Sequence, residues 1–329
     1  MLIEHQHPDN KSIMVAVLGA PNVGKSSMIN YLTGMDLSIV TRLPQTTRNK
    51  FHCVFTIDKT EVILVDTPGL HKSNQEFNKR MNQQAREGVF GADLNLLMID
   101  LSKEVLQQIV DFKENIRNNE LGKTWLVFTK TDLISNINSL PLDEVFEKAK
   151  EILGEVDRYL YISSKDGDNM HILTGAICDV AAPGPHMYNK NQASNKHTRF
   201  FVTEYVREQL FELLKDELPY QVAVTIDEYV DLRKEKNKIE GVHSTIVAQI
   251  AASIHVNRPS QRAIVIGSGG SMIKKVGMAA REKIENLVGG QINLNLHVKV
   301  SPKWFKNNFI LEEIGLPRAI DSNRVWRQK

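Results

Sequence analysis

The feature that most constrains this chain is the stretch GAPNVGKS, which runs from Gly19 to Ser26. It matches the pattern G-x-x-x-x-G-K-[ST], and it lies between an apolar run, Ser12–Gly19, and a run of helical character, Lys25–Leu32. In this context glycines let backbone N–H groups curl around a phosphate, and the N-terminus of the following helix favours its negative charge. The sequence therefore predicts a phosphate-binding loop in a strand–loop–helix unit.

The side chains of this loop and of a second run, VILVDTPG, have separate expected roles. Lys25 would reach the β- and γ-phosphates of a nucleotide, and the Ser26 hydroxyl is placed to bind Mg²⁺. The second run brings Asp66 to the metal side at the end of an apolar strand, and Gly69 offers a backbone N–H to the γ-phosphate. We expect nucleotide contacts from Gly19, Ala20, Pro21, Asn22, Val23, Gly24, Lys25, Ser26, Ser27, Asp66, Thr67, Pro68 and Gly69.

The segment TKTD, which follows the apolar run Trp125–Phe128, predicts which base is bound. The Asp132 carboxylate can accept hydrogen bonds from both N1–H and the N2 amino group of guanine, whereas adenine offers no such pair of donors. The stem of Lys130 would lie over the purine. The familiar pattern has Asn in place of Thr129, whose hydroxyl can still bridge to the phosphate loop. A backbone N–H for guanine O6 is expected from Ser163, Ser164 and Lys165, so the elements together indicate GTP.

Strand and helix signals alternate over residues 1–182. This alternation predicts an α/β domain with a doubly wound, mainly parallel sheet that is covered by helices on both faces. The expected strands are Ser12–Gly19, Phe51–Ile57, Glu61–Val65, Asn95–Ile99, Thr124–Phe128 and Tyr159–Ser163, with helices over Lys25–Leu32 and Met170–Ala181.

A polar segment with prolines and a glycine, residues 183–198, predicts a linker. The pattern then changes to helix–strand–strand–helix–strand, which predicts a small α+β domain over residues 199–301, followed by a basic tail over 302–329. The expected elements are a helix over Phe200–Lys215, strands over Gln221–Val230 and Ser244–Asn257, a helix over Ser271–Leu287 and a strand over Gln291–Val300.

The net charge of +2 conceals an asymmetry along the chain. From Gly241 to Lys329 there are 13 Lys and Arg against 5 Asp and Glu, a charge of +8, which leaves 28 against 34, or −6, for the first 240 residues. The excess of positive charge favours a polyanionic partner for the C-terminal part. A solvated basic face without a partner is the alternative.

Composition indicates the compartment. No apolar run approaches the roughly 18–20 residues that span a bilayer. The first ten residues, MLIEHQHPDN, lack the apolar core of a signal peptide, and the two cysteines, Cys53 and Cys178, are too few for a disulfide framework. We therefore expect a cytoplasmic protein, and the sequence leaves open a peripheral association with the cytoplasmic face of the inner membrane.

With these motifs in place, the chain resembles the bacterial Era family of GTPases from about Ile13 to Gly315. The matching stretches are APNVGKSSMIN, QTTRNK, VDTPGLHK and TKTD in this order, followed by ELPYQVAVTIDEY and IVIGSGGSMIKKVGMAAREKIENLVGGQINLNLHVKV. The resemblance implies a Ras-like GTP-hydrolysing domain, a type II KH domain, and a role in assembly of the small (30S) ribosomal subunit. It also implies that the bound RNA is single-stranded sequence near the 3′ end of 16S rRNA, and a monomer is expected.

The resemblance also assigns switch residues. In the first switch segment, Gln45–Asn49, Thr47 would bind Mg²⁺ in the GTP state, with Thr46 as the fallback. Leu70 stands where Ras-type proteins use glutamine to orient the attacking water, so intrinsic hydrolysis should be slow. Asn22 matches an asparagine that helps related GTPases hold K⁺, although it is also suited to a turn; His71 is interpreted as a switch-loop residue. The expected catalytic residues are Lys25, Thr47 and Gly69, and the expected metal ligands are Ser26, Thr47 and Asp66 for Mg²⁺ and Asn22 for K⁺.

The four residues GSGG at 267–270 fit the G-x-x-G loop by which KH domains clamp single-stranded nucleic acid. Because no basic residue lies between the glycines, Lys274 and Lys275 are expected to supply the charge. Further on, Lys303 and Trp304 belong to a run that interleaves lysines with aromatic residues, on which bases can stack; packing of Trp304 on the core is the alternative. The candidate RNA-binding residues are Gly267, Ser268, Gly269, Gly270, Lys274, Lys275, Lys303 and Trp304.

Two other functions are compatible with parts of this pattern. One is an RNA-binding module with a non-hydrolysing nucleotide pocket, against which the intact Lys25, Ser26, Asp66 and Asp132 argue. The other is a GTPase that serves tRNA modification, which predicts a helical partner-binding domain and a C-terminal cysteine. Neither feature is present in the sequence.

Overall fold

The computed structural model describes residues 6–41, 43, 46–68, 77, 80, 81, 83, 91–116, 121–137, 141–154, 156–233 and 245–316. The chain divides into two compact units. One comprises Met1–Ser73 and Met81–Lys196, and the other comprises Asn74–Arg80 and His197–Lys329.

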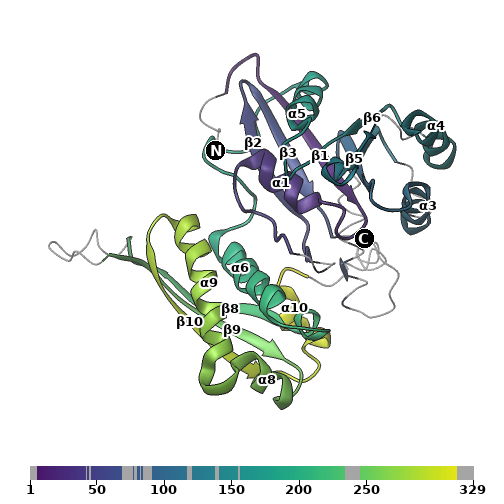
Figure 1. Ribbon diagram of the computed structural model, residues 1–329. Coiled ribbons are helices and arrows are strands. Elements are labelled where there is room, and N and C mark those ends of the chain that lie inside the picture. Colours follow the sequence, from purple (N-terminus) through teal and green to yellow (C-terminus); the bar gives the residue numbers. More distant parts are fainter. Residues whose placement is uncertain are drawn as a thin grey trace, which may run out of the picture. The chain divides into compact units, whose positions relative to one another are not determined.

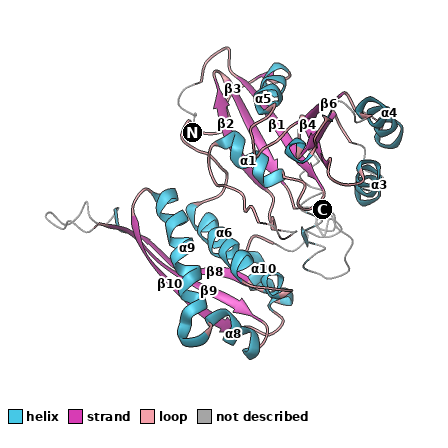
Figure 2. Ribbon diagram, in the orientation of Figure 1, coloured by secondary structure: helices cyan, strands magenta, loops and turns pink. Residues whose placement is uncertain are grey.

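The first unit is built on a sheet with the strand order β2-β3-β1-β4-β5-β6 (Figures 1 and 2). β1 pairs in parallel with β3 and β4, and β5 pairs in parallel with β4 and β6, whereas β2 runs antiparallel to β3 and β7 antiparallel to β1. The strands are β1 (Lys11–Gly19), β2 (Phe51–Ile57), β3 (Thr60–Asp66), β4 (Leu94–Asp100), β5 (Thr124–Thr129), β6 (Arg158–Tyr161) and β7 (Ala182–Pro183). The predicted doubly wound, mainly parallel sheet is confirmed.

Helices cover both faces of this sheet, so its inner strands are buried along their whole length. Every residue of β3, β4 and β5 is buried, as expected for strands with helices on either side. α3 and α4 pack on one face, where Phe112 and Leu153 join a core cluster with Leu97, while α1 and α5 contact strands of the sheet on the other. The helices are α1 (Lys25–Thr33), α3 (Val105–Ile116), α4 (Leu142–Leu153) and α5 (Met170–Asp179), with a 3-10 turn, η1 (Thr131–Leu133).

The predicted linker is docked along the open edge of β2. The Val54 amide donates to Ala193 O at 2.8 Å, and Cys53 forms an antiparallel bridge with Ser194. The buried Glu61 carboxylate accepts the amides of Met187 and Tyr188 at 2.7 and 3.0 Å. The segment therefore protects an edge strand that would otherwise present unpaired backbone groups.

The second unit contains a three-stranded sheet of order β10-β9-β8, in which β9 is antiparallel to β8 and parallel to β10 (Figures 1 and 2). α6 and α9 pack against each other and against strands of this sheet. The elements are α6 (Thr198–Leu213), η3 (Leu218–Gln221), β8 (Ala223–Asp231), β9 (Ile246–Val256), α8 (Pro259–Ile266), η4 (Ser268–Gly270), α9 (Ser271–Val288), β10 (Gln291–Val300), η5 (Trp304–Lys306) and α10 (Asn308–Glu313).

The order predicted for this unit is wrong in one respect, because α8 is an additional helix before α9. It spans eight residues, to which the expected order assigned neither a helix nor a strand. A start signal was nevertheless present: Pro259 occupies the first turn, where its missing N–H costs nothing, and the side chain of Gln261 accepts the backbone N–H of Arg258.

Residues 302–316 of the expected tail pack within this unit. The Trp304 side chain is 1% exposed, and its indole N–H donates to Gln221 O at 2.8 Å. The rings of Phe77 and Trp304 meet edge to face with centroids 5.6 Å apart, and Arg80 donates to Leu316 O at 3.0 Å. Trp304 therefore fills the core of the unit.

Within the described segments, no helix combines the length and the apolar character that a membrane crossing would need.

Candidate nucleotide-binding site and nucleic-acid interface

A cavity of about 380 Å³ lies where β1 ends and α1 begins. In open α/β sheets ligands bind outside the carboxyl ends of the strands. They bind at the switch point, where the order of the strands reverses so that the next strands are added on the opposite side. β1 is such a strand, because β3 lies on one side of it and β4 on the other. The cavity is lined by Pro21, Asn22, Gly24, Lys25, Ser26, Ser27, Ile39, Val40, Thr41, Thr46, Thr47 and Lys130.

The phosphate loop depends on the absence of a side chain at Gly19. This residue has φ +138°, which side chains rarely allow, and an added Cβ would lie 2.6 Å from Met98 O of the neighbouring strand. Gly24 (φ +103°) and Asn22 (φ +61°) complete the turn into α1. The loop thus bends against β4 and directs its backbone to the cavity.

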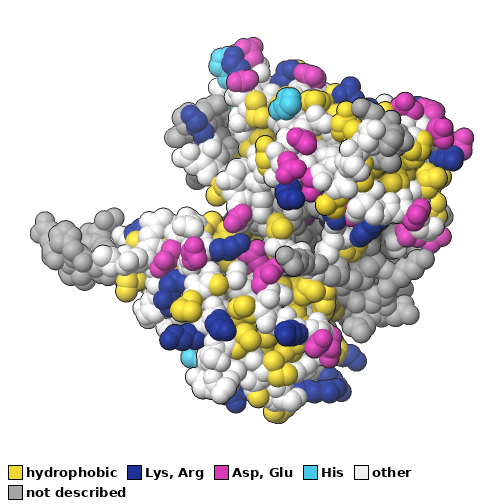
Figure 3. All heavy atoms as spheres, in the orientation of Figure 1, with side chains coloured by type: hydrophobic (Ala, Val, Ile, Leu, Met, Phe, Trp, Pro, Cys, Tyr) yellow, Lys and Arg dark blue, Asp and Glu magenta, His cyan; other side chains and the backbone are white. Residues whose placement is uncertain are grey.

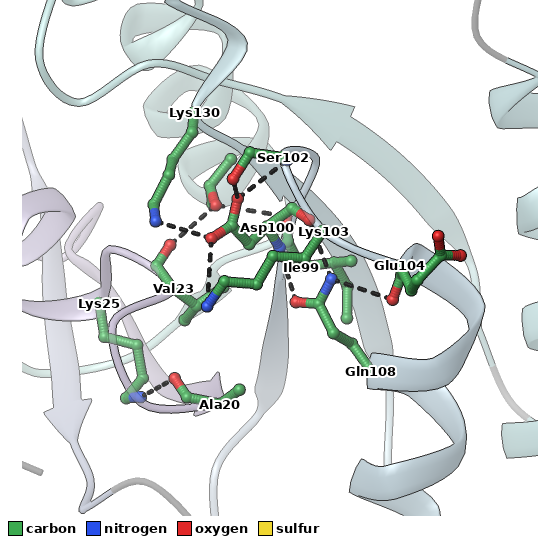
Figure 4. Close-up of polar contacts among 11 residues, drawn as sticks. Ala20, Val23, Lys25, Ile99, Asp100, Ser102, Lys103, Glu104, Gln108 and Lys130 are labelled. Carbon is green, nitrogen blue, oxygen red and sulfur yellow. Dashed lines mark hydrogen bonds and ion pairs between the residues drawn. The ribbon is translucent and has the colours of Figure 1, made fainter. Parts of the chain in front are cut away.

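Lys25 is buried and lies folded on the loop itself. Its Nζ donates to Gly19 O at 3.0 Å and to Ala20 O at 2.8 Å (Figure 4 shows the second contact). Burial lowers the pKa of the Lys25 ammonium to about 8, and the negative charge of Asp66 opposes this shift. A phosphate group would add negative charge beside the buried ammonium, so phosphate binding and the charged lysine stabilise each other.

The expected magnesium ligands are hydroxyl and carboxylate oxygens. Ser26 and Thr47 line the cavity, while Asp66 is fully buried and accepts a hydrogen bond from the Ser38 hydroxyl. Hard oxygen donors of this kind are those that Mg²⁺ prefers. The donor set therefore fits Mg²⁺, which would be held by Ser26, Thr47 and Asp66.

Sequence reasoning missed Ser38. The Asn30 side chain fixes its backbone, with Oδ1 accepting the Ser38 amide and Nδ2 donating to Ser38 O, both at 2.8 Å. No motif marks this serine. Only its hydrogen bond to Asp66, 28 positions further along the chain, shows that it belongs to the site.

The base-side residues are tied to the phosphate loop. The Thr129 hydroxyl donates to Val23 O at 2.7 Å, so it makes the bridge to the phosphate loop that the sequence predicted. The Asp132 carboxylate accepts the Ser163 hydroxyl at 3.0 Å and lies 3.6 Å from Lys165 Nζ. Sequence reasoning gave Ser163 only a possible backbone role, whereas its side chain orients the carboxylate that would select guanine.

Several predicted residues have other partners or lie outside the described residues. The Thr67 hydroxyl donates to Val17 O at 2.8 Å, so that side chain holds β1 to the chain that follows β3. Gln45, Gly69, Leu70 and His71 are outside the described part of the chain, as are residues 317–329 of the expected tail.

In the second unit the GSGG loop joins α8 to α9. Ser268 and Gly269 are exposed, and Lys274 and Lys275 are exposed on the first turns of α9. Gly267, Gly269 and Gly270 have φ of +75°, +57° and +79°. The loop is thus open to a ligand, with positive charge close to it.

The surface around this loop differs from the prediction in two ways. Ile264 and Met278 are 55% and 54% exposed on the flanking helices, and sequence reasoning assigned neither a role. In the space-filling view apolar side chains lie among Lys and Arg side chains on this unit (Figure 3). Lys303 is exposed, but the prediction that Trp304 stacks on bases is wrong because its ring is buried.

Comparison with known proteins gives consistent matches. A family described as "50S ribosome-binding GTPase" matches residues 14–130, and one described as "KH domain" matches residues 217–305. GTPase Era of Thermotoga maritima is 36% identical over 307 residues, which cover 93% of this chain and 97% of the relative. GTPase Era of Lacticaseibacillus paracasei is 33% identical over 314 residues, which cover 93% and 97%.

Two of the solved structures that resemble this chain match it over most of its length. One is a crystal structure of Era in complex with MgGDPNP and nucleotides 1506–1542 of 16S ribosomal RNA, with a TM-score of 0.83 and 28% identity over 94% of this chain and 100% of that one. The other is a variant of Aquifex aeolicus Era bound to GDP·AlF4⁻, with a TM-score of 0.82, 28% identity and the same coverage.

Proposed function

This chain belongs to the Era family of GTPases, and we propose that it is a GTP-hydrolysing switch that binds the 3′ region of 16S rRNA and assists assembly of the 30S subunit. The observation that carries this proposal is the pairing of two features: in one unit, a phosphate-loop cavity whose loop is bonded to Thr129 of the segment that contains Asp132, and in the other, an open GSGG loop. The structural relative that holds both MgGDPNP and nucleotides 1506–1542 of 16S rRNA supports the choice of ligands.

Hydrolysis in this proposal rests on positioning and charge. Mg²⁺, when bound, would neutralise charge that develops on the β- and γ-phosphates. Lys25 would hold the same phosphates with an ammonium that burial has already stripped of water. With Leu70 in place of a water-orienting glutamine, we expect slow intrinsic turnover. We further propose that the γ-phosphate orders residues 45–49 and 66–72, which couples nucleotide state to RNA binding.

A monovalent cation is a finer part of the proposal. Asn22 lines the cavity at φ +61°, and we propose that its amide oxygen helps to hold K⁺ in place of an arginine finger. Turnover is expected to be about tenfold faster in KCl than in NaCl of equal ionic strength. Asn22→Gly keeps the backbone conformation while removing the amide, and should abolish the difference. Equal wild-type rates in the two salts would remove K⁺ from the mechanism.

Binding of RNA is tested at Gly269. Its φ of +57° is one that Asp and Asn adopt, and an added Cβ would meet nothing within 4 Å, so Gly269→Asp should fold. A carboxylate there repels phosphate, and we expect affinity for an oligonucleotide of the 16S rRNA 3′ end to fall about tenfold, with GDP affinity unchanged. Gly269→Asn is the matched neutral control and should bind RNA more tightly than the Asp variant.

The outcomes separate the candidate functions. Equal loss of RNA and GDP binding in Gly269→Asp would contradict the division of labour between the two units. RNA binding without any GTP turnover, with the RNA present, would favour the RNA-binding module, and binding of tRNA in preference to the 16S rRNA oligonucleotide would favour the tRNA-modification GTPase. The proposal includes a cytoplasmic monomer, with peripheral association with the inner membrane as an alternative location.

A further inference from the structure

A buried carboxylate that no motif singles out lies beside the base-recognition segment. Asp100 is the last residue of β4 and is 1% exposed. In the parallel register of β4 and β5 it stands opposite Thr129, the residue directly before Lys130. Figure 4 shows the side chains of Asp100 and Lys130 converging from the ends of these two strands.

The two oxygens of this carboxylate have different partners. Oδ2 accepts Lys130 Nζ at 2.6 Å, and Lys103 Nζ lies 3.7 Å from the same oxygen (Figure 4). Oδ1 accepts both the amide and the hydroxyl of Ser102, at 3.0 and 2.6 Å. The ammonium of Lys130 is therefore held by a carboxylate that is itself fixed in orientation.

The backbone of Asp100 is clamped as well. The Gln108 side chain accepts the Asp100 amide and donates to the Asp100 carbonyl, both at 2.9 Å. The Thr129 hydroxyl donates to Val23 O and to Ile99 O, at 2.7 and 3.2 Å. Side-chain hydrogen bonds thus join the end of β4 to the base-recognition segment, and this segment to the phosphate loop.

Charge on Asp100 is retained at neutral pH. Burial by itself raises the pKa of this carboxyl, but the hydrogen bonds from Lys130 and Ser102 outweigh it, and the pKa lies below its ordinary value. The Lys130 side chain is 30% exposed and lines the nucleotide cavity, whereas that of Lys103 is 54% exposed. Lys130 is thus the partner of Asp100 that a nucleotide would meet.

We propose that Asp100 is a positioning residue for guanine recognition: it anchors the Lys130 ammonium so that the alkyl stem of the lysine lies extended across the place of the purine ring. The inference rests on the proposed GTP-dependent function. A free lysine would lose much side-chain entropy on covering the base, and an anchored one has lost it beforehand, so the anchor raises affinity by pre-organisation. The contrasting role is a turn cap, in which Asp100 only fixes the Asp100–Lys103 turn.

A double-mutant cycle on the full-length protein separates these roles. Asp100→Asn keeps an oxygen for Ser102 but removes the charge that holds Lys130, and it should raise the Kd for GDP about tenfold, mainly through faster dissociation. In a Lys130→Met background the same change should have no further effect on the Kd. An equal loss in both backgrounds, or no loss in the first, would overturn the proposal. Asp111→Asn, the same substitution at an exposed residue of α3, is the control and should change the Kd less than about twofold.

A second test needs no variant. In a crystal structure of the wild-type chain with GDP, Lys130 Nζ should stay within ion-pair distance of Asp100. A lysine that leaves Asp100 when guanine binds would also overturn the proposal. Failure of the function itself has a different signature, because wild-type protein would then show no preference for GDP over ADP.

Discussion

Asp132→Asn is expected to weaken GDP and GTP binding roughly 1000-fold, since a site built to pair with a specific set of donors loses most of its affinity when that pairing is broken. The carboxylate is held by the Ser163 hydroxyl at 3.0 Å and lies near Lys165, so it is already aimed when the base arrives. The asparagine amide has an acceptor oxygen and a donor NH2 group. Its NH2 group would face the N2 amino group of guanine, and two donors repel each other. Xanthine carries a carbonyl at that position, so the variant should prefer xanthosine nucleotides.

Calorimetric titration with GDP, ADP and xanthosine diphosphate measures this change directly. The matched control is Asp166→Asn, an identical substitution at an exposed residue of the loop that follows β6, which should leave GDP affinity within about twofold of wild type. If Asp132→Asn still prefers GDP over the other two nucleotides, the carboxylate is not the group that selects the base.

Gly19→Val is expected to abolish detectable nucleotide binding and to lower the free energy of unfolding by about 3 kcal/mol. The clash is with Met98 O, a backbone atom of a fully buried strand that has little freedom to retreat, and the φ of +138° adds strain for any side chain. Relief of the clash would push the phosphate loop away from β4. Nucleotide binding and stability should therefore be lost together.

Gly34→Ala serves as the control for backbone strain without a clash. Gly34 ends α1 at φ +65°, and an added Cβ would meet nothing within 4 Å. This variant should lose about 1 kcal/mol of stability and keep its GDP affinity. Chemical denaturation and fluorescence titration of both variants give the comparison, and a Gly19→Val protein that binds GDP normally would show that the loop does not need the close approach to β4.

Features that depend on neighbouring residues in the chain were predicted from the sequence. The phosphate loop, the strand that ends at Asp66 and the segment that contains Asp132 are each contiguous, and their residue types set the local backbone and the chemistry together. The alternation of apolar runs with helical ones similarly predicted the parallel sheet. The same reasoning missed α8, whose eight residues carry only about two turns of periodicity.

The sequence by itself determined the phosphate loop and its place at the end of a strand, because a run of consecutive residues contains all the information that this local geometry needs. Only the tertiary structure decided that Asp100 meets Lys130, that Ser38 meets Asp66 and that Trp304 is buried beneath Gln221. These partners are separated by about 30 positions or more, and which of the many polar and aromatic side chains come together depends on how the strands and helices pack.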